Sequence, residues 1–257
     1  MSAASATGLW LDLLLGLAAW VLCTARRNAG LVDIFWPLFF LATAGASLAY
    51  ADLPGTRAIL LVALVAIWAL RLAGFLALRN WNAPEDHRYA RIRARNEPGF
   101  AWKSLFIVFW LQALLAWVLA APLRAAIGSG GDAGLADAIG FTVAACGLVI
   151  EAVADDQLAR FRASPGNASA VLDSGLWRYS RHPNYFGEFV YWWGVWLVAC
   201  AAGAAWTAYA PLLLTFMLLR VSGVALTERT IGERRPAYAQ YMRRTSAFVP
   251  LPPRRSP

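Results

Sequence analysis

The chain has 257 residues, of which 60% are hydrophobic and only 15% are charged, and it contains 13 tryptophans. This composition excludes an ordinary soluble enzyme of this length and indicates an integral membrane protein. The net charge of +8 does not indicate nucleic-acid binding, because most basic residues flank apolar segments. The three cysteines show no CxxC spacing, so we expect neither a metal site nor a disulfide framework.

Apolar stretches long enough to cross a bilayer follow one another along the chain. A spanning helix needs about 20 mostly apolar residues. The stretches that qualify are 7–25, 31–51, 57–79, 103–122, 135–154, 184–203 and 205–226. We therefore expect an all-α integral membrane protein with about seven transmembrane helices. Little sequence remains for a soluble domain, so residues 1–257 are expected to form a single polytopic membrane domain.

The basic residues are distributed unevenly between the two sides of the predicted bundle. If the helices alternate in direction, one side receives 24–30, 80–102, 155–183 and the segment after 226. Counted with the charged helix ends, this side holds 19 of the 23 Lys and Arg. The positive-inside rule places it in the cytoplasm and the N-terminus outside, in what we expect to be the bacterial inner membrane. The first apolar stretch is expected to be retained, because Arg26 and Arg27 follow it and do not precede it.

Ionisable residues of both signs lie in or at the edge of the predicted spans. Such groups are costly in a bilayer and normally face a partner or a water-filled cavity. They are Asp33, Arg71, Glu151, Glu188 and Arg220. Their number and mixed charge favour a functional polar cavity, and purely structural ion pairing is the alternative.

Two of the predicted helices place polar residues on one face. Glu151, Asp155 and Arg162 have helical spacing along a face that runs from the membrane into the cytoplasmic loop. Asn184 and Glu188 are also one turn apart, at the start of the sixth predicted span. The sequence therefore predicts a carboxamide and several carboxylates near the cytoplasmic rim.

The loop before the sixth span combines arginines with a helix start. Pro183 suits the first turn of a helix, and Ser180 or His182 is expected to cap it. A helix N-terminus beside Arg178 and Arg181 favours phosphate. The alternative is that these arginines only anchor the loop at the membrane surface. Our hypothesis is an anionic cofactor held at this rim.

The segment after the last span is basic and carries two tyrosines three residues apart. Glu228 precedes Tyr238 and Tyr241, and the arginines around them are Arg234, Arg235, Arg243 and Arg244. One interpretation is a lid that binds phosphate or ribose. The other is an amphipathic segment lying on anionic lipid.

The motif "SGLWRYSRHPNYFGE" at 174–188 resembles the C-terminal signature of the steroid 5-alpha-reductase-like superfamily of membrane enzymes. The stretches "VDIFWP" at 32–37, "EDHRY" at 85–89 and "GVALTE" at 223–228 resemble a bacterial branch of that superfamily. The resemblance to the bacterial branch covers nearly the whole chain. The resemblance to the reductases proper marks 141–252 as the cofactor-binding half.

The resemblance implies a seven-helix fold, NADPH on the cytoplasmic side, and reduction of a carbon–carbon double bond conjugated to a carbonyl in a lipophilic substrate. Matching positions imply cofactor contacts at Asp155, Arg162, Asn184, Glu188 and Arg220. Glu151 and Glu228 stand at further cofactor-binding positions, where the reductases carry other polar residues. The reductases bind the steroid ketone with a Gln-Glu pair in the second helix, which is missing here, where Asp33 and Trp36 stand instead. The candidate proton donors are Asp33, Asp86 and Tyr89.

The same "RHPNYFGE" motif also resembles the isoprenylcysteine carboxyl methyltransferases, which use S-adenosylmethionine. The Arg-His-Pro triplet favours that group, whereas arginines at 162, 178 and 181 favour NADPH, because the methyl donor has no phosphate. The main expectation is therefore an NADPH-dependent reductase acting on an enone or other unsaturated lipid. The alternatives are a methyltransferase of a membrane lipid or isoprenoid and a non-enzymatic lipid-binding or transport protein.

Overall fold

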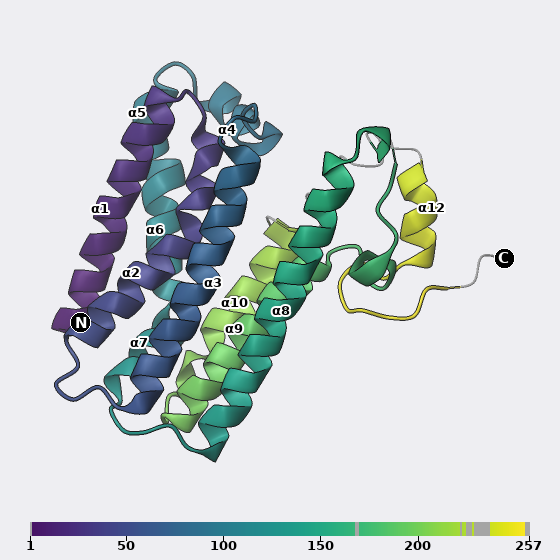
Figure 1. The fold of residues 1–257 in the computed structure, drawn as a ribbon. Coiled ribbons are helices and arrows are strands. Elements are labelled where there is room, and N and C mark those ends of the chain that lie inside the picture. Colours follow the sequence, from purple (N-terminus) through teal and green to yellow (C-terminus); the bar gives the residue numbers. More distant parts are fainter. Residues whose placement is uncertain (1, 168–169, 222, 225–227, 229–236, 255–257) are drawn as a thin grey trace. The chain divides into compact units, whose positions relative to one another are not determined.

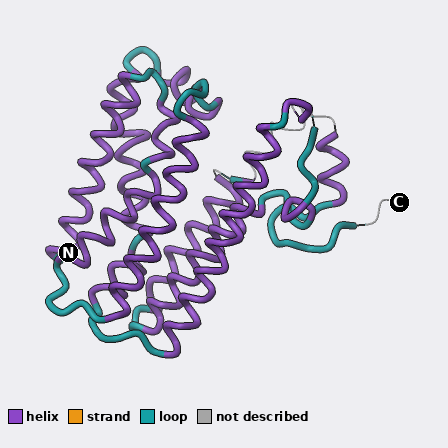
Figure 2. Tube along the Cα trace, in the orientation of Figure 1, coloured by secondary structure: helices purple, strands orange, loops and turns teal. Residues whose placement is uncertain are grey.

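Helices and their connecting loops make up the chain in the computed structural model, which describes residues 2–167, 170–221, 223–224, 228 and 237–254 (Figure 2). Within these ranges no strand occurs, and one isolated bridge joins Ser180 and Ser246. The predicted all-α class is confirmed. The chain forms two units: unit 1 contains 1–134 and 199–207, and unit 2 contains 135–198 and 208–257.

Unit 1 begins with a long helix that packs against the next two segments of the chain (Figure 1). Its elements are α1 (Ala3–Ala25), η1 (Ala29–Ile34), α2 (Trp36–Ala49), α3 (Thr56–Asn80), α4 (His87–Asn96), α5 (Phe100–Ser104), η2 (Leu105–Trp110), α6 (Leu111–Leu119), α7 (Ala121–Gly128) and η5 (Ala205–Ala208). Large apolar side chains such as Phe39, Phe40 and Trp68 are fully buried between them. Unit 1 therefore has its own core.

Five helical segments among the described residues are long and apolar enough to cross a membrane. They are Ala3–Ala25, Ala29–Ala49, Thr56–Asn80, Phe100–Leu119 and Leu135–Ala163. Each corresponds to one of the predicted spans, with ends that shift by a few residues. The largest shift is at the fifth, which continues to Ala163 because Glu151, Asp155 and their neighbours extend the same helix beyond its apolar part.

The other two predicted spans are also helical but differ from these five. Helix α9 (Pro183–Ala201) has 19 residues, and its polar and aromatic first turns lower its mean hydropathy. The run Ala205–Val221 is apolar but shorter. The end of that predicted span, at 222 and 225–226, lies outside the described residues. The count of seven crossings and their orientation stay predictions.

Unit 2 is built around two long helices, α8 and α9 (Figure 1). Its elements are α8 (Leu135–Ala163), η3 (Pro165–Asn167), η4 (Gly175–Arg178), α9 (Pro183–Ala201, of which 199–201 belong to unit 1), α10 (Tyr209–Phe216), η6 (Met217–Val221) and α12 (Ala237–Arg244). Pro183 is the first helical residue of α9, where its missing N–H leaves no bond unmade. Ser180 Oγ accepts from His182 N at 3.1 Å, so Ser180 orders the turn that precedes the helix.

Glycines let the backbones of α8 and α9 approach closely. A Cβ on Gly140 would lie 2.7 Å from Val198 N, and a Cβ on Gly194 would lie 2.7 Å from Ala144 Cα. Gly147 meets Tyr191 in the same way, and Gly187 of α9 meets Glu151 of α8. Residue numbers of the contacting partners rise along α8 while they fall along α9. The two helices are therefore antiparallel and pack in a single register. Small residues at such positions are typical of helix pairs in membranes.

Candidate functional site

The register of α8 against α9 brings two predicted site residues together in unit 2. One turn beyond the contact of Glu151 with Gly187, α8 carries Asp155 and α9 begins with Pro183 and Asn184. Asn184 Nδ2 donates to Asp155 Oδ1 at 3.2 Å. The predicted carboxamide and carboxylate are therefore joined in a part-buried position.

The acceptor atom of Asn184 is left open by this arrangement. Asn184 Oδ1 is buried and has no hydrogen-bond partner among the described residues. Buried polar atoms are nearly always bonded, so an open acceptor calls for a donor that is supplied from elsewhere. Glu151, Asp155 and Glu188 are all buried on the same two helices. This end of the helix pair is therefore polar, enclosed and able to accept a ligand hydrogen bond.

Arg181, which precedes α9, makes hydrogen bonds through all three guanidinium nitrogens and through its backbone N–H. Its Nε and Nη2 donate to the two carboxylate oxygens of Glu228 at 2.7 and 2.9 Å. Its Nη1 donates to the carbonyl oxygens of Met242 and Thr245 at 2.8 and 2.7 Å. Its backbone N–H donates to Ser246 O at 2.9 Å. Arg181 therefore fastens the segment after α12 to the start of α9, and its planar fork is occupied by a carboxylate.

Glu228 is the centre of this network. His182 Nε2 lies 3.1 Å from Glu228 Oε1, on the same oxygen that accepts from Arg181 Nε. Burial alone raises the pKa of Glu228, but the hydrogen bonds from His182 and Arg181 and the Arg181 charge outweigh it and lower the pKa to about 2. Glu228 is therefore an ionised partner for both basic side chains.

The two tyrosines of α12 face inward. Neither the lid nor the lipid-bound segment considered from the sequence predicts this. Tyr238 and Tyr241 are both 6% exposed, and their rings meet edge to face at 5.4 Å. Tyr241 donates to the carbonyl oxygen of Trp177 in the loop before α9. Burial raises the pKa of Tyr238 to about 12, so its hydroxyl stays protonated. The tyrosines therefore pack α12 onto the loop that leads into α9.

A polar cavity of ≈ 470 Å³ opens between that loop and α12. Its lining consists of Val171, Asp173, Ser174, Gly175, Arg178, Gln240, Tyr241, Arg244, Thr245 and Pro253. The guanidinium groups of Arg178 and Arg244 are exposed and make no hydrogen bond or ion pair with the described residues. Two uncommitted guanidinium groups and three hydroxyls give this cavity the chemistry of an anion site.

The candidate proton donors form a separate cluster in unit 1. Tyr89 Oη donates to Asp33 Oδ1 at 2.5 Å, and Arg88 Nη2 donates to Asp33 Oδ2 at 3.0 Å. Gln112 Nε2 donates to Tyr89 Oη at 3.1 Å. Burial, followed by the charge of Asp33, raises the pKa of Tyr89 well above its usual value. Asp33 thus acts as an acceptor, and Tyr89 carries the proton.

Asp86, the third candidate donor, has a structural role. Its carboxylate caps α4 by accepting from Arg88 N at 2.9 Å, and it also accepts from Arg88 Nε at 2.9 Å. Burial raises the pKa of Asp86, but the bonds from Arg88 outweigh it and lower the pKa. An ionised cap has no proton to donate.

The remaining predicted arginines occupy other positions of the chain. Arg162 lies exposed near the end of α8, and Arg220 lies exposed in η6. Arg71 lies within α3. Arg234 and Arg235 lie outside the described residues.

Three residues of these clusters were not proposed as site residues from the sequence. Gln112 carries a polar amide within an otherwise apolar predicted span. Like the charged residues, it could have been identified because polar groups in a span normally face a partner or a cavity. Arg88 lies within "EDHRY" between two predicted residues. Arg244 was noted only as one of several basic residues, because its position in a cavity depends on how α12 docks.

Comparison with known proteins identifies a similar protein and a matching family. It is 26% identical over 274 residues to an uncharacterized protein of the fission yeast Schizosaccharomyces pombe, in an alignment that covers 95% of this chain and 78% of that protein. No solved structure matches the chain. Residues 19–245 match the family described as "Protein of unknown function (DUF1295)", and the chain therefore belongs to that family.

Proposed function

We propose that this chain is a membrane-embedded, NADPH-dependent reductase of a carbon–carbon double bond in a lipophilic enone, related to the steroid 5-alpha-reductase-like superfamily. The observation that carries the proposal is the pair of uncommitted guanidinium groups, Arg178 and Arg244, in the ≈ 470 Å³ cavity. Planar guanidinium groups bind phosphate through paired N–H donors. S-adenosylmethionine has no phosphate, and its sulfonium charge would be repelled by two arginines.

The residues of unit 2 fit a phosphorylated dinucleotide. Arg178 and Arg244 would hold a phosphate, with hydroxyl groups of Ser174 and Thr245 in the same cavity lining. Asn184 Oδ1 would accept a hydrogen bond from a hydroxyl or amide of the ligand. Arg181, which the sequence predicted as a phosphate ligand, instead orders the loop through Glu228. Bound NADPH supplies the hydride that reduces the double bond.

For the proton that must reach the reduced substrate, we propose Tyr89. Of the three predicted donors, Asp86 is an ionised cap and Asp33 accepts from Tyr89 and Arg88. Tyr89 alone carries a hydroxyl proton, and Gln112 and Asp33 fix the position of that oxygen. The Tyr89 O–H, which donates to Asp33 Oδ1 in this structure, would turn to the carbonyl oxygen of the substrate and stabilise the negative charge that develops there. Asp33 and Gln112 would be positioning residues.

A methyltransferase that uses S-adenosylmethionine is the second candidate. It is favoured by the carboxylates Glu151, Asp155 and Glu188, which are buried on one helix pair and suit a cationic ligand. The Arg-His-Pro triplet at 181–183 also favours the methyltransferase group. The third possibility is a lipid-binding or transport protein, which would bind neither ligand.

Ligand-dependent stability of the purified full chain tests the proposal. A ligand that binds only the folded protein stabilises it by about 2.7 kcal/mol when present at 100 times its dissociation constant. We expect NADPH to raise the melting temperature and S-adenosylmethionine to leave it unchanged. Stabilisation by S-adenosylmethionine alone would favour the methyltransferase, and stabilisation by neither would contradict both enzymatic proposals.

Single-residue variants test which side chains bind NADPH and which one takes part in the reduction. Arg178→Gln and Arg244→Gln should each weaken NADPH binding about 10- to 100-fold, the effect of losing a charge-assisted hydrogen bond. Arg243→Gln is the matched control, because Arg243 is the exposed neighbour on α12 and does not line the cavity. Tyr89→Phe should retain the NADPH-dependent stabilisation but lower the oxidation of NADPH by a long-chain enone about 10²- to 10⁴-fold.

A further inference from the structure

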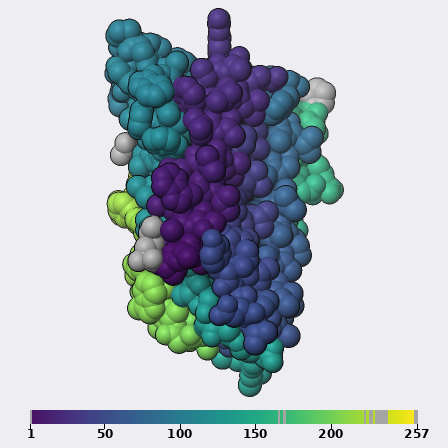
Figure 3. Space-filling view, turned by 90° about the vertical axis from the view of Figure 1, so that its left-hand side faces the viewer, coloured from purple at the N-terminus to yellow at the C-terminus, as the bar shows by residue number. Residues whose placement is uncertain are grey.

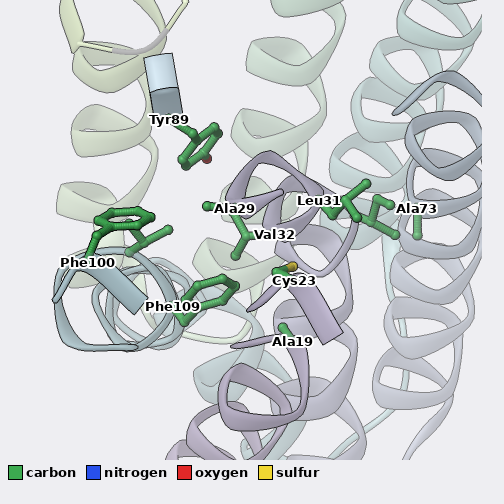
Figure 4. Close-up of a cluster of buried hydrophobic side chains, with 11 residues drawn as sticks. Ala19, Cys23, Ala29, Leu31, Val32, Ala73, Tyr89, Phe100 and Phe109 are labelled. Atoms are coloured by element: carbon green, nitrogen blue, oxygen red, sulfur yellow. The ribbon is translucent and has the colours of Figure 1, made fainter. Parts of the chain in front are cut away.

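A second cavity lies in unit 1, remote in sequence from the residues of the proposed cofactor site. It has a volume of ≈ 460 Å³ and is lined by Cys23, Thr24, Arg27, Ala29, Arg93, Phe100, Ala101, Ser104 and Phe109. Figure 4 shows Cys23, Ala29, Phe100 and Phe109 as neighbours in the apolar part of this region. The volume lies within the range of pockets that hold small ligands. The two arginines are its charged members.

Arg27 occupies a backbone position that favours glycine. Asn28 N donates to Cys23 O and Arg27 N donates to Thr24 O, which is the pattern of a Schellman motif at the end of α1. Arg27 is the residue of that motif with positive φ, at 53°. A non-glycine residue in this conformation carries a steric penalty. The chain thus keeps an arginine where glycine would be more stable, and strain of this kind is a signal of function.

The guanidinium group of Arg27 has no partner among the described residues, and it is exposed at the cavity. Arg93 is fixed in position, since its Nε and Nη2 donate to Glu85 at 3.0 and 2.7 Å. Its guanidinium carbon lies 4.5 Å from the centre of the Phe100 ring. Nη1 of Arg93 makes no hydrogen bond with any of the described residues. The exposed guanidinium of Arg27 and Nη1 of the fixed Arg93 therefore remain open to an anion.

The cavity lies where apolar helices end. Helix α1 ends at Ala25, just before Arg27, and the fourth candidate span begins at Phe100. Apolar side chains on the outer surface lead toward it: Leu14 and Val21 of α1 are 59% and 56% exposed, and Trp102 is 61% exposed. Figure 3 shows α1 lying open on this face of the protein. Long exposed apolar side chains on a spanning helix face lipid tails.

We propose that this cavity binds the phosphate headgroup of an anionic membrane phospholipid, with Arg27 as the principal ligand and Arg93 as the fixed one. The acyl chains would lie along the exposed apolar faces of α1 and of the helix that begins at Phe100. Basic residues next to a spanning helix attract anionic lipids of the cytoplasmic leaflet. The proposal uses no residue of the NADPH site and does not depend on the reductase activity.

Native mass spectrometry of the detergent-purified full chain tests this, with titration of phosphatidylglycerol, phosphatidylcholine and inorganic phosphate. We expect phosphatidylglycerol to bind more tightly than phosphatidylcholine. Arg27→Gln should weaken phosphatidylglycerol binding about 10- to 100-fold, since a charge-assisted contact is lost. Arg95→Gln is the control, because Arg95 is an exposed residue of the same helix as Arg93 and does not line the cavity.

Arg27→Gly separates binding from folding. Glycine removes the steric penalty at positive φ, so the melting temperature without lipid should rise by about 2–4 °C. Binding of phosphatidylglycerol should fall as it does in Arg27→Gln. Equal binding of phosphatidylglycerol to all variants would overturn the proposal. Inorganic phosphate binding as tightly as the phospholipid would also overturn it, because the site would then take a soluble anion.

Discussion

Among single residues, Arg181 and Glu228 illustrate how a part-buried ion pair organises unit 2. The two residues are 47 positions apart in sequence, and contacts of 2.7 and 2.9 Å join the loop before α9 to Glu228, which precedes α12. Breaking such a pair by removing one partner leaves the other charge buried and unpaired. Arg181 also donates to the carbonyl oxygen of Thr245, so the ion pair helps to fix a residue that lines the polar cavity.

Acid should weaken this pair in a predictable pH range. The pKa of Glu228 is lowered from 4.5 to about 2, so its contribution to stability is fully present above about pH 4.5 and is lost as the pH falls toward 2. Glu228→Gln should therefore be less stable than the wild type at pH 6, by about 1–2 kcal/mol, because the Glu228 side chain is 19% exposed and water screens part of the interaction. We expect this difference to shrink steadily below pH 4.5. Melting temperatures of both proteins across pH 6 to 3 measure it, and a difference that does not change with pH would contradict the assignment.

At the scale of elements, the close approach of α8 and α9 sets the geometry of the candidate site. Gly147 and Gly187 face backbone atoms of the opposite helix, and a Cβ on Gly187 would lie 2.8 Å from Glu151 Cα. This contact brings Asp155 within hydrogen-bonding distance of Asn184. A helix pair without these glycines would sit farther apart, and side chains on the facing surfaces would lose their partners.

Gly147→Ala should therefore destabilise the protein. The added methyl group would lie 2.7 Å from Tyr191 Cα, and overpacking of this kind costs about 1–3 kcal/mol. We expect the melting temperature to fall by several degrees. Gly74→Ala in α3 is the matched control, because its Cβ would meet nothing within 4 Å. Alanine there should stabilise the helix by about 0.5–1 kcal/mol. Similar melting temperatures for the two variants would show that the α8–α9 approach is not tight.

At the scale of the whole molecule, the number of bilayer crossings depends on α9 and on the last apolar run, Ala205–Val221. Five are long and apolar enough by themselves. Helix α9 has 19 residues and would be about 28 Å long, close to the roughly 30 Å thickness of the hydrocarbon core. No charged residue lies between Ala201 and Ala208, the connection between α9 and the last apolar run. We therefore expect both of these segments to cross as well.

A reporter inserted at Gly203 distinguishes seven crossings from five. Gly203 is exposed, adopts φ of 79° and lies in the turn after α9, so an insertion there disturbs no helix. With seven crossings and the predicted orientation, a reporter that is active only outside the cytoplasm should give a signal at Gly203 and none after Pro257. With five crossings, Gly203 would lie on the same side as the C-terminus, and the signal at Gly203 would be absent.

The helices and most of their ends were predictable from the sequence. Runs of apolar residues and the position of Pro183 are local features, and a spanning helix satisfies its own backbone hydrogen bonds whatever lies beside it. Polar residues such as Asp33, Glu151, Asn184 and Glu188 were also identifiable, since they are unexpected in apolar segments. Sequence alone therefore determined the all-α class and the candidates for a site.

The partners of those candidates were decided only by the tertiary structure. Arg178 and Arg181 lie three residues apart and looked alike in sequence, yet Arg181 is enclosed by Glu228 and the segment after α12, whereas Arg178 faces a cavity. Gln112 meets Tyr89 across a separation of 23 residues. Such pairs depend on which helix faces meet and in which register. That register is set by close contacts between residues far apart in the chain, and no local pattern encodes it.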